Sequence, residues 1–404
     1  MIVALLATLA LAGTWDLGGT SLRDVAMAGN GVASGQPGLA IPADPASVGR
    51  VDGEAASLAW RTTVFNVDAR GDQMVQGPVQ AFDLAVAAGS TQGDVGLGAG
   101  LSFHLPLPAA VNSAVHARLE DVYAPLLEDA ADFAGADFAA GVSYGRFEWG
   151  FGASASMDLV ANTDITLYSL SMAPDEDGNS DITESVSLRF DRQLKWRFAP
   201  LGGVHYRGED VHIYLSYRGE NGFRTTGDTT LEIAIDSPIW DDFEDIPLDL
   251  QYLSAWSPAR GVLGGSMTVG PVTPEATVRY LRSSTWLDTQ SRAPEPRFKD
   301  TLQAGLGGEL DAGNGLLMRT GYGYVPSPVP EQTGGTRFVD STRHVVGLGG
   351  AYSWDDLPRK SDRTTLALSL QAQFLEKRRD GAEGFRWTTK GQIYTVTAGI
   401  WSRL

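Results

Sequence analysis

The side chains that most often carry out catalysis are not grouped in this sequence as a catalytic or metal site. The five histidines, His104, His116, His205, His212 and His344, are scattered over separate predicted strands and a loop, without the HExxH or paired spacing of metal ligands. The chain has no cysteine, which removes thiolate metal ligands, disulfides and cysteine nucleophiles together. We therefore expect no enzymatic activity, no metal and no cofactor.

The composition indicates a folded protein with an acidic surface. In 404 residues, 31 basic and 49 acidic side chains give a formal net charge of −18, which argues against nucleic acid as a partner. The 10 Trp, 15 Phe and 12 Tyr provide ample apolar surface to bury, which disfavours disorder. An apolar run ends in Ala10-Leu11-Ala12, the small-x-small pattern of a signal peptidase site, so residues 1–12 are expected to be a signal peptide.

Beyond about residue 55 the sequence is a succession of alternating segments, the pattern of β-strands. Short polar connections alternate with long linkers, which is typical of an up-and-down barrel with unequal rims. No later stretch has the ~18 apolar residues of a membrane helix. We predict an all-β protein, a single transmembrane antiparallel up-and-down β-barrel in the bacterial outer membrane. Its about 14 strands lie near 55–68, 77–90, 93–104, 137–145, 147–170, 184–206, 209–235, 248–270, 272–285, 300–310, 314–325, 341–354, 362–375 and 391–404.

Glycines and acidic residues form two further patterns in this barrel. Gly96, Gly98 and Gly100 form a Gly-x-Gly-x-Gly run in mid-strand and not before a helix, so a dinucleotide site is disfavoured. We interpret the run as barrel wall that another segment approaches closely. The acidic stretch 175–181 lacks the glycine and glutamate of an EF-hand loop. Together with 241–245 it either stays hydrated or bridges lipopolysaccharide through divalent cations.

Two regions lack the strand alternation. Residues 13–54 are rich in Gly, Ala and Pro, and the lumen of such a barrel is wide enough to need filling or to conduct. We predict that they form an N-terminal plug, or hatch, inside a barrel made by 55–404. The outer loop near 106–136 contains a predicted amphipathic helix. Its apolar face either lines a ligand groove or only packs the loop down, and consists of Leu119, Val122, Tyr123, Leu126 and Leu127.

One stretch closely resembles a known family. Phe298-Lys299-Asp300-Thr301 begins a strand, and the Gly-aromatic run 321–324 leads into Ser327-Pro328-Val329-Pro330 and then Asp340-Ser341-Thr342-Arg343. Their order and spacing resemble the FadL family of outer-membrane transporters for long-chain fatty acids and other hydrophobic compounds. The two prolines stiffen an outer loop. Asp340 and Arg343 either pair and pin that loop or are solvated.

The N-terminal part is similar to the same family in a looser way. Residues 21–33 look like the Gly-Ala-rich plug of the family, and Asp44-Pro45-Ala46 occupies the place of its Asn-Pro-Ala motif. We expect the Asp44 side chain to bond neighbouring amides and to order the turn that leads from plug to barrel.

The resemblance implies passive uptake of hydrophobic small molecules such as fatty acids, captured at the outer loops and passed through a plugged lumen. The protein would then be a monomer in contact with outer-membrane lipid and lipopolysaccharide. Two alternatives stay open. One is a barrel without transport that acts as a secretion or surface-attachment scaffold, and the other is a secreted β-sandwich or propeller enzyme that binds carbohydrate.

If the apolar face of the loop helix is the capture groove, replacing Leu126 and Leu127 by Asp will abolish uptake of a hydrophobic substrate, because a charged face cannot bury an alkyl chain. Barrel assembly, measured by heat-modifiable migration on a gel, will be unchanged. Uptake at the unmodified rate would remove this helix from the capture site.

Overall fold

The computed structural model describes most of the barrel and two parts of the N-terminal region. The described residues are 19, 21–32, 40–69, 72–73, 78–106, 135–168, 185–234, 245–287, 293–331, 340–355, 363–380 and 387–403. The predicted signal peptide and the predicted loop helix at 119–134 lie outside them. No helix among the described residues is long and apolar enough to cross a membrane.

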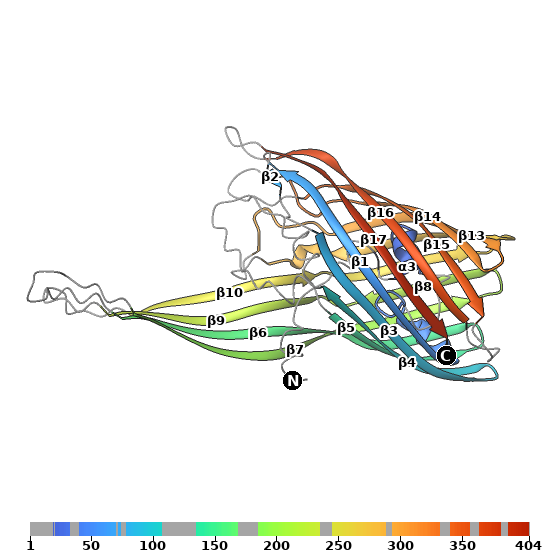
Figure 1. The fold of residues 1–404 in the computed structure, drawn as a ribbon, viewed down its shortest axis with the longest axis horizontal. Helices are drawn as coiled ribbons and strands as arrows, with labels where there is room; N and C mark the ends of the chain where they lie inside the picture. Colours follow the sequence, from blue (N-terminus) through green and yellow to red (C-terminus); the bar gives the residue numbers. More distant parts are fainter. Residues whose placement is uncertain are drawn as a thin grey trace, which may run out of the picture.

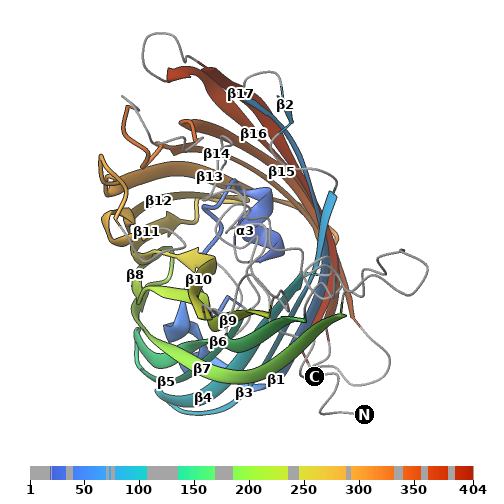
Figure 2. The same cartoon turned by 90° about the vertical axis from the view of Figure 1, so that its left-hand side faces the viewer.

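The strands join into one sheet that closes on itself (Figures 1 and 2). In chain order they are β1 (Gly53–Ala69), β2 (Asp72–Gln73), β3 (Pro78–Gln92), β4 (Val95–Pro106), β5 (Gly135–Tyr144), β6 (Phe147–Tyr168), β7 (Ser185–Arg207), β8 (Val211–Arg218), β9 (Asn221–Ala234), β10 (Asp245–Ser257), β11 (Ala259–Met267), β12 (Val272–Arg282), β13 (Thr301–Gly313), β14 (Leu316–Val325), β15 (Arg343–Asp355), β16 (Arg363–Asp380) and β17 (Trp387–Arg403). The helices are α3 (Leu22–Ala26), η1 (Pro45–Arg50) and η2 (Ser283–Thr285).

These elements form the predicted barrel of fourteen strands. β2 is a two-residue extension, while β8 with β9 and β10 with β11 are each one strand interrupted by a short break. The last strand pairs with the first in antiparallel register, from Ala55 opposite Arg403 to Ala69 opposite Thr389. The closure leaves no free edge between the chain ends, as a membrane-spanning sheet requires.

The alternation of the sequence becomes an inside-out alternation of the wall. On β16, Leu366, Leu368 and Leu370 are about half exposed, whereas Ala367 and Ser369 between them are buried. The outward apolar residues recur around the barrel, among them Leu97, Phe151, Leu215, Leu263, Leu306 and Leu348. Exposure of this much apolar surface in water would be unfavourable at ~25 cal/mol per Å². The chain is therefore an outer-membrane barrel whose outer face meets lipid.

One part of the wall departs from simple neighbour pairing. The ladder between β7 and β8 ends at Leu201 opposite Arg218, next to Pro200, which has no N–H to donate. Beyond this point β9 pairs with β6 in parallel and with β10 in antiparallel orientation. The strands β6, β7, β9 and β10 extend far beyond the others on the long-loop side (Figure 1). At 22 and 23 residues, β6 and β7 are about twice the length needed to cross a bilayer.

Charge on the outer face tests the lipid contact. Leu348 lies near the middle of β15 and is 57% exposed, so we expect Leu348→Lys to lower the free energy of unfolding by about 2–4 kcal/mol. The measurement is urea-dependent folding into lipid vesicles, with Leu348→Met as the size-matched control. Equal stability of the Lys and Met variants would contradict a lipid-facing position.

Candidate functional site

The described parts of the N-terminal region, residues 21–32 and 40–52, lie inside the barrel (Figure 2). We call them together the luminal segment. Ser21 caps the N-terminus of helix α3, since its Oγ accepts a hydrogen bond from the Asp24 N–H at 3.1 Å. Val25, Ala26, Met27 and most of η1 are completely buried. Neither helix is long enough to be stable alone, so contact with the wall must hold the segment.

A first row of glycines in the wall lies against η1. Five directly paired glycines follow one another across β3, β4, β5, β6 and β7, at Gly89, Gly98, Gly141, Gly150 and Gly203. A Cβ added at Gly98 or Gly150 would collide with the backbone of Val48 or Pro45. One added at Gly96 would lie 2.5 Å from the Gly49 carbonyl oxygen. The prediction that the Gly-x-Gly-x-Gly run meets another segment is therefore confirmed.

A second row of glycines lies against the end of α3 and the turn that follows it. Gly307, Gly321 and Gly347 are paired across β13, β14 and β15, and an added Cβ on each would meet Ala26 or Met27 within 3.0 Å. The turn itself has positive φ at Ala28 (54°) and Gly29 (89°). The Asn30 amide closes it by donating to the Met27 carbonyl at 2.9 Å, and reaches the wall at the Tyr322 carbonyl at 3.1 Å.

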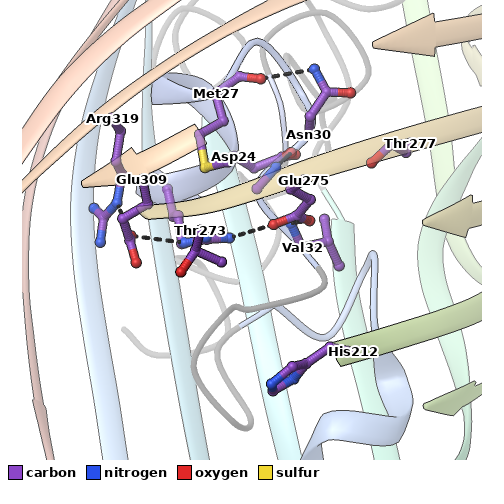
Figure 3. Close-up of polar contacts among 12 residues, drawn as sticks. Asp24, Met27, Asn30, Val32, His212, Thr273, Glu275, Thr277, Glu309 and Arg319 are labelled. Atoms are coloured by element: carbon purple, nitrogen blue, oxygen red, sulfur yellow. Dashed lines mark hydrogen bonds and ion pairs between the residues drawn. The ribbon is translucent and has the colours of Figure 1, made fainter. Parts of the chain in front are cut away.

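Buried ion pairs join α3 to this side of the wall (Figure 3). The Arg23 guanidinium lies 3.0 Å from Glu275 on β12 and 3.1 Å from Glu309 on β13. Arg319 on β14 pairs with the same Glu309 at 2.6 Å. Glu275 also accepts a hydrogen bond from the Val32 N–H at 2.7 Å. Removing one member of such a buried group costs about 3–5 kcal/mol, because its partner is left charged and unpaired.

A second polar group joins the η1 region to the other side of the wall. Asp44 lies 2.7 Å from His205 Nδ1 on β7, and both side chains are buried. Arg50 pairs with Glu148 on β6 at 2.8 Å, and Arg207 pairs with the same carboxylate at 2.9 Å. The luminal segment is thus fixed to two different arcs of the barrel. Between these arcs, Val32 and Ala43 pack together with Tyr214 and Val262.

The predicted motif Asp44-Pro45-Ala46 lies at the start of η1. The expected bonding of the Asp44 side chain to neighbouring amides is not found, since no side-chain cap bond forms and its Oδ2 faces His205 instead. Pro45 occupies the first helical position, where its missing N–H costs nothing. Ala46 is fully buried against the position of Gly150, where a larger wall residue would not fit.

The second predicted motif forms a pinned loop at the outer rim. Ser327 donates from Oγ to Asp340 at 2.7 Å, and the Pro328 carbonyl accepts from the Lys299 N–H at 2.7 Å. Val329 packs with Trp256, Trp286 and Phe298 in a buried cluster. Asp340 is buried, and burial raises its pKa above the usual value while the Arg343 charge and the Ser327 hydroxyl act in the opposite direction.

The residue that clamps this loop most directly is Arg378, which the sequence did not indicate. Its guanidinium donates to the carbonyls of Val329 at 2.8 Å and Pro330 at 2.5 Å, and it pairs with Asp380 at 2.9 Å. The predicted clamp Arg343 is buried nearby and acts on Asp340 through its charge. A register shift between Leu375 and Arg378 turns this side chain toward the loop, and a bulge of this kind has no sequence signature.

The remaining site predictions have different outcomes. The groove residues Leu119, Val122, Tyr123, Leu126 and Leu127 lie outside the described residues. Residues 141–145 have the Gly-x-Ser-x-Gly spacing of a nucleophile elbow, which the structure places at the end of β5 before a tight turn into β6, with no helix following. Ser143 there is buried. Among the described residues no group of acidic or histidine side chains is arranged to hold a metal ion.

No protein-family model and no curated protein matches this chain. Among solved structures, a Pseudomonas aeruginosa FadL homologue is similar with a TM-score of 0.59 and 14% identity, over 94% of this chain and 98% of the other. The Pseudomonas putida toluene transporter TodX has a TM-score of 0.54 and 17% identity, over 96% and 99%. The Ralstonia pickettii toluene transporter TbuX has 0.53 and 16%, over 96% and 100%. As the sequence resemblance predicts, the chain has the FadL-family fold.

Proposed function

We propose that this protein is a channel for passive entry of hydrophobic small molecules across the outer membrane, and that the luminal segment is its plug. The observation that carries the proposal is a lumen occupied by a segment that two glycine rows and two buried polar groups hold in place. The fold shared with toluene transporters supports hydrophobic cargo. A fatty acid and an aromatic hydrocarbon are both candidates for that cargo.

The physical requirements of such a channel follow from its cargo. Burying an alkyl chain yields ~0.8 kcal/mol per CH₂, so capture at the outer side needs only an apolar surface. The proposed surface is the loop-helix face at 119–127. Passage then needs the plug to shift. The contacts of the plug suit a reversible shift, because those that the described residues make are ion pairs, hydrogen bonds, backbone contacts and apolar packing, all of which can break and form again.

A reversible lock of the plug tests the proposal. An added Cβ at Gly307 would lie 3.4 Å from Asn30 Cβ, close to the 3.5–4.5 Å of a disulfide, and only the flexible terminal methyl of Met27, 2.6 Å away, would have to move aside. The natural chain has no cysteine, so Asn30→Cys with Gly307→Cys would form the only bridge. We expect uptake of radiolabelled toluene and oleate by proteoliposomes to fall strongly in the oxidised form and to return on reduction.

Each single cysteine variant is the matched control, and its uptake should not depend on oxidation. Uptake by the oxidised double variant at the reduced rate would refute movement of this part of the plug. Uptake of both compounds no faster than in empty vesicles, with all variants folded, would refute the channel and favour the scaffold alternative.

Loosening the plug has the opposite expected effect. Arg23→Met removes the cation that Glu275 and Glu309 share, although Glu309 keeps Arg319, at a cost of about 3–5 kcal/mol for the seated plug. We expect faster entry of a hydrophobic fluorescent dye than in the unmodified protein. The control is Arg146→Met, which removes an exposed pair of the same 3.0 Å length with Glu209 and should change entry little. Equal entry in the two variants would contradict a role of Arg23 in holding the plug.

A further inference from the structure

The outer wall has a hollow on its lipid-facing side that transport through the lumen does not use. It is a groove of about 810 Å³ across β13, β14, β15 and β16, within the size range of sites that enclose a small ligand. Its floor lies at Gly308 and Gly350. A Cβ added at Gly308 would meet nothing within 4 Å, and one at Gly350 only the Leu317 carbonyl oxygen at 3.6 Å. The groove is therefore deepest over these two glycines, where no side chain fills the space outside the backbone.

The sides of the groove are apolar residues that point away from the lumen. Met318, Leu348 and Leu368 are each more than half exposed, and the strand register brings Gly350 between Met318 and Leu368. Thr320 is a polar residue of the floor, paired directly with Gly308. Its hydroxyl donates to the Gly347 carbonyl at 3.1 Å, so its hydrogen is used inside the wall. Two further polar residues of the lining, Glu309 and Arg319, pair with each other at 2.6 Å, so the groove favours an apolar occupant.

The position of the groove identifies which apolar molecule reaches it. It begins on the short-turn side of the barrel, near the β13–β14 turn, and short turns face the periplasm in outer-membrane barrels. Tyr352 lines this end and stacks on Trp354, with ring centroids 6.2 Å apart. Such aromatic pairs lie at the level of lipid headgroups. The groove therefore runs from headgroup level into the hydrocarbon of the periplasmic leaflet, which consists of phospholipid.

We propose that this groove holds an acyl chain of one phospholipid of the periplasmic leaflet, with the lipid's glycerol region beside Tyr352. The inner side of the same wall is the second glycine row, where Gly307 and Gly347 receive Met27 and Ala26. The bound acyl chain fills the hollow on the outer face of this wall, and the luminal segment lies against the inner face. The site does not depend on the proposed transport activity.

Filling the hollow tests the proposal. In Gly308→Leu/Gly350→Leu the new side chains occupy the open space without touching the luminal segment. The protein is reconstituted with phosphatidylethanolamine, then stripped stepwise with detergent and weighed by native mass spectrometry. We expect the unmodified protein to retain one phospholipid more than the double variant. The matched control is Gly202→Leu on β7, an outward glycine with room for a side chain, and it should retain lipid like the unmodified protein.

Equal lipid retention by the unmodified protein and the double variant overturns the proposal. So does an added mass equal to a second copy of the chain, since it would make the groove a dimer contact. Heat-modifiable migration checks that the variants are folded. If the double variant does not fold, Tyr352→Ala serves in its place, because it opens the rim end of the groove without adding bulk and should release the lipid at a lower detergent concentration.

Discussion

The close approach of two backbones is the interaction on which the rest of this structure depends. The luminal segment lies directly on wall backbone at two glycine rows, at distances that no side chain would allow. The glycines of each row lie directly opposite one another on neighbouring strands, so the contact with the luminal segment depends on this strand register. A shift of one strand by one residue would turn its glycine to the outer face. The register of the barrel strands thus determines where the luminal segment can lie.

The polar groups around the segment serve a different purpose from the glycines. Replacing a buried ion pair by apolar residues is often neutral or stabilising, so pairs such as Arg23–Glu275 and Asp44–His205 are weak evidence for added stability. They also favour one position of the segment, because Arg23 and Asp44 meet their partners on different arcs of the wall at the same time. The charges are also compatible with water, which a segment meets when it leaves its seat.

The fold was largely predictable from the sequence because strand alternation is local. The fourteen segments read from period-two patterns correspond to the barrel strands, and Gly96 and Gly98 pointed correctly to a close contact. The contacts that the sequence did not predict depend on long-range geometry. The role of Arg378 needs a bulge, and the pairing of Asp44 with His205 joins residues 161 positions apart. The parallel pairing of β9 with β6 likewise depends on tertiary structure, and the local sequence pattern does not predict it.

The same alternation of side chains explains why one stretch of wall makes contact with the luminal segment on its inner face and with lipid on its outer face. In Gly307-Gly308 and Gly349-Gly350, the first glycine of each pair faces the luminal segment and the second faces lipid. At these glycines the wall has no side chains, so only its hydrogen-bonded backbone separates the luminal segment from the membrane. Glycine weakens a strand, and a wall of this kind gains rigidity only from what packs on it. The luminal segment supplies that packing from inside, and an acyl chain in the groove is suited to supply it from outside.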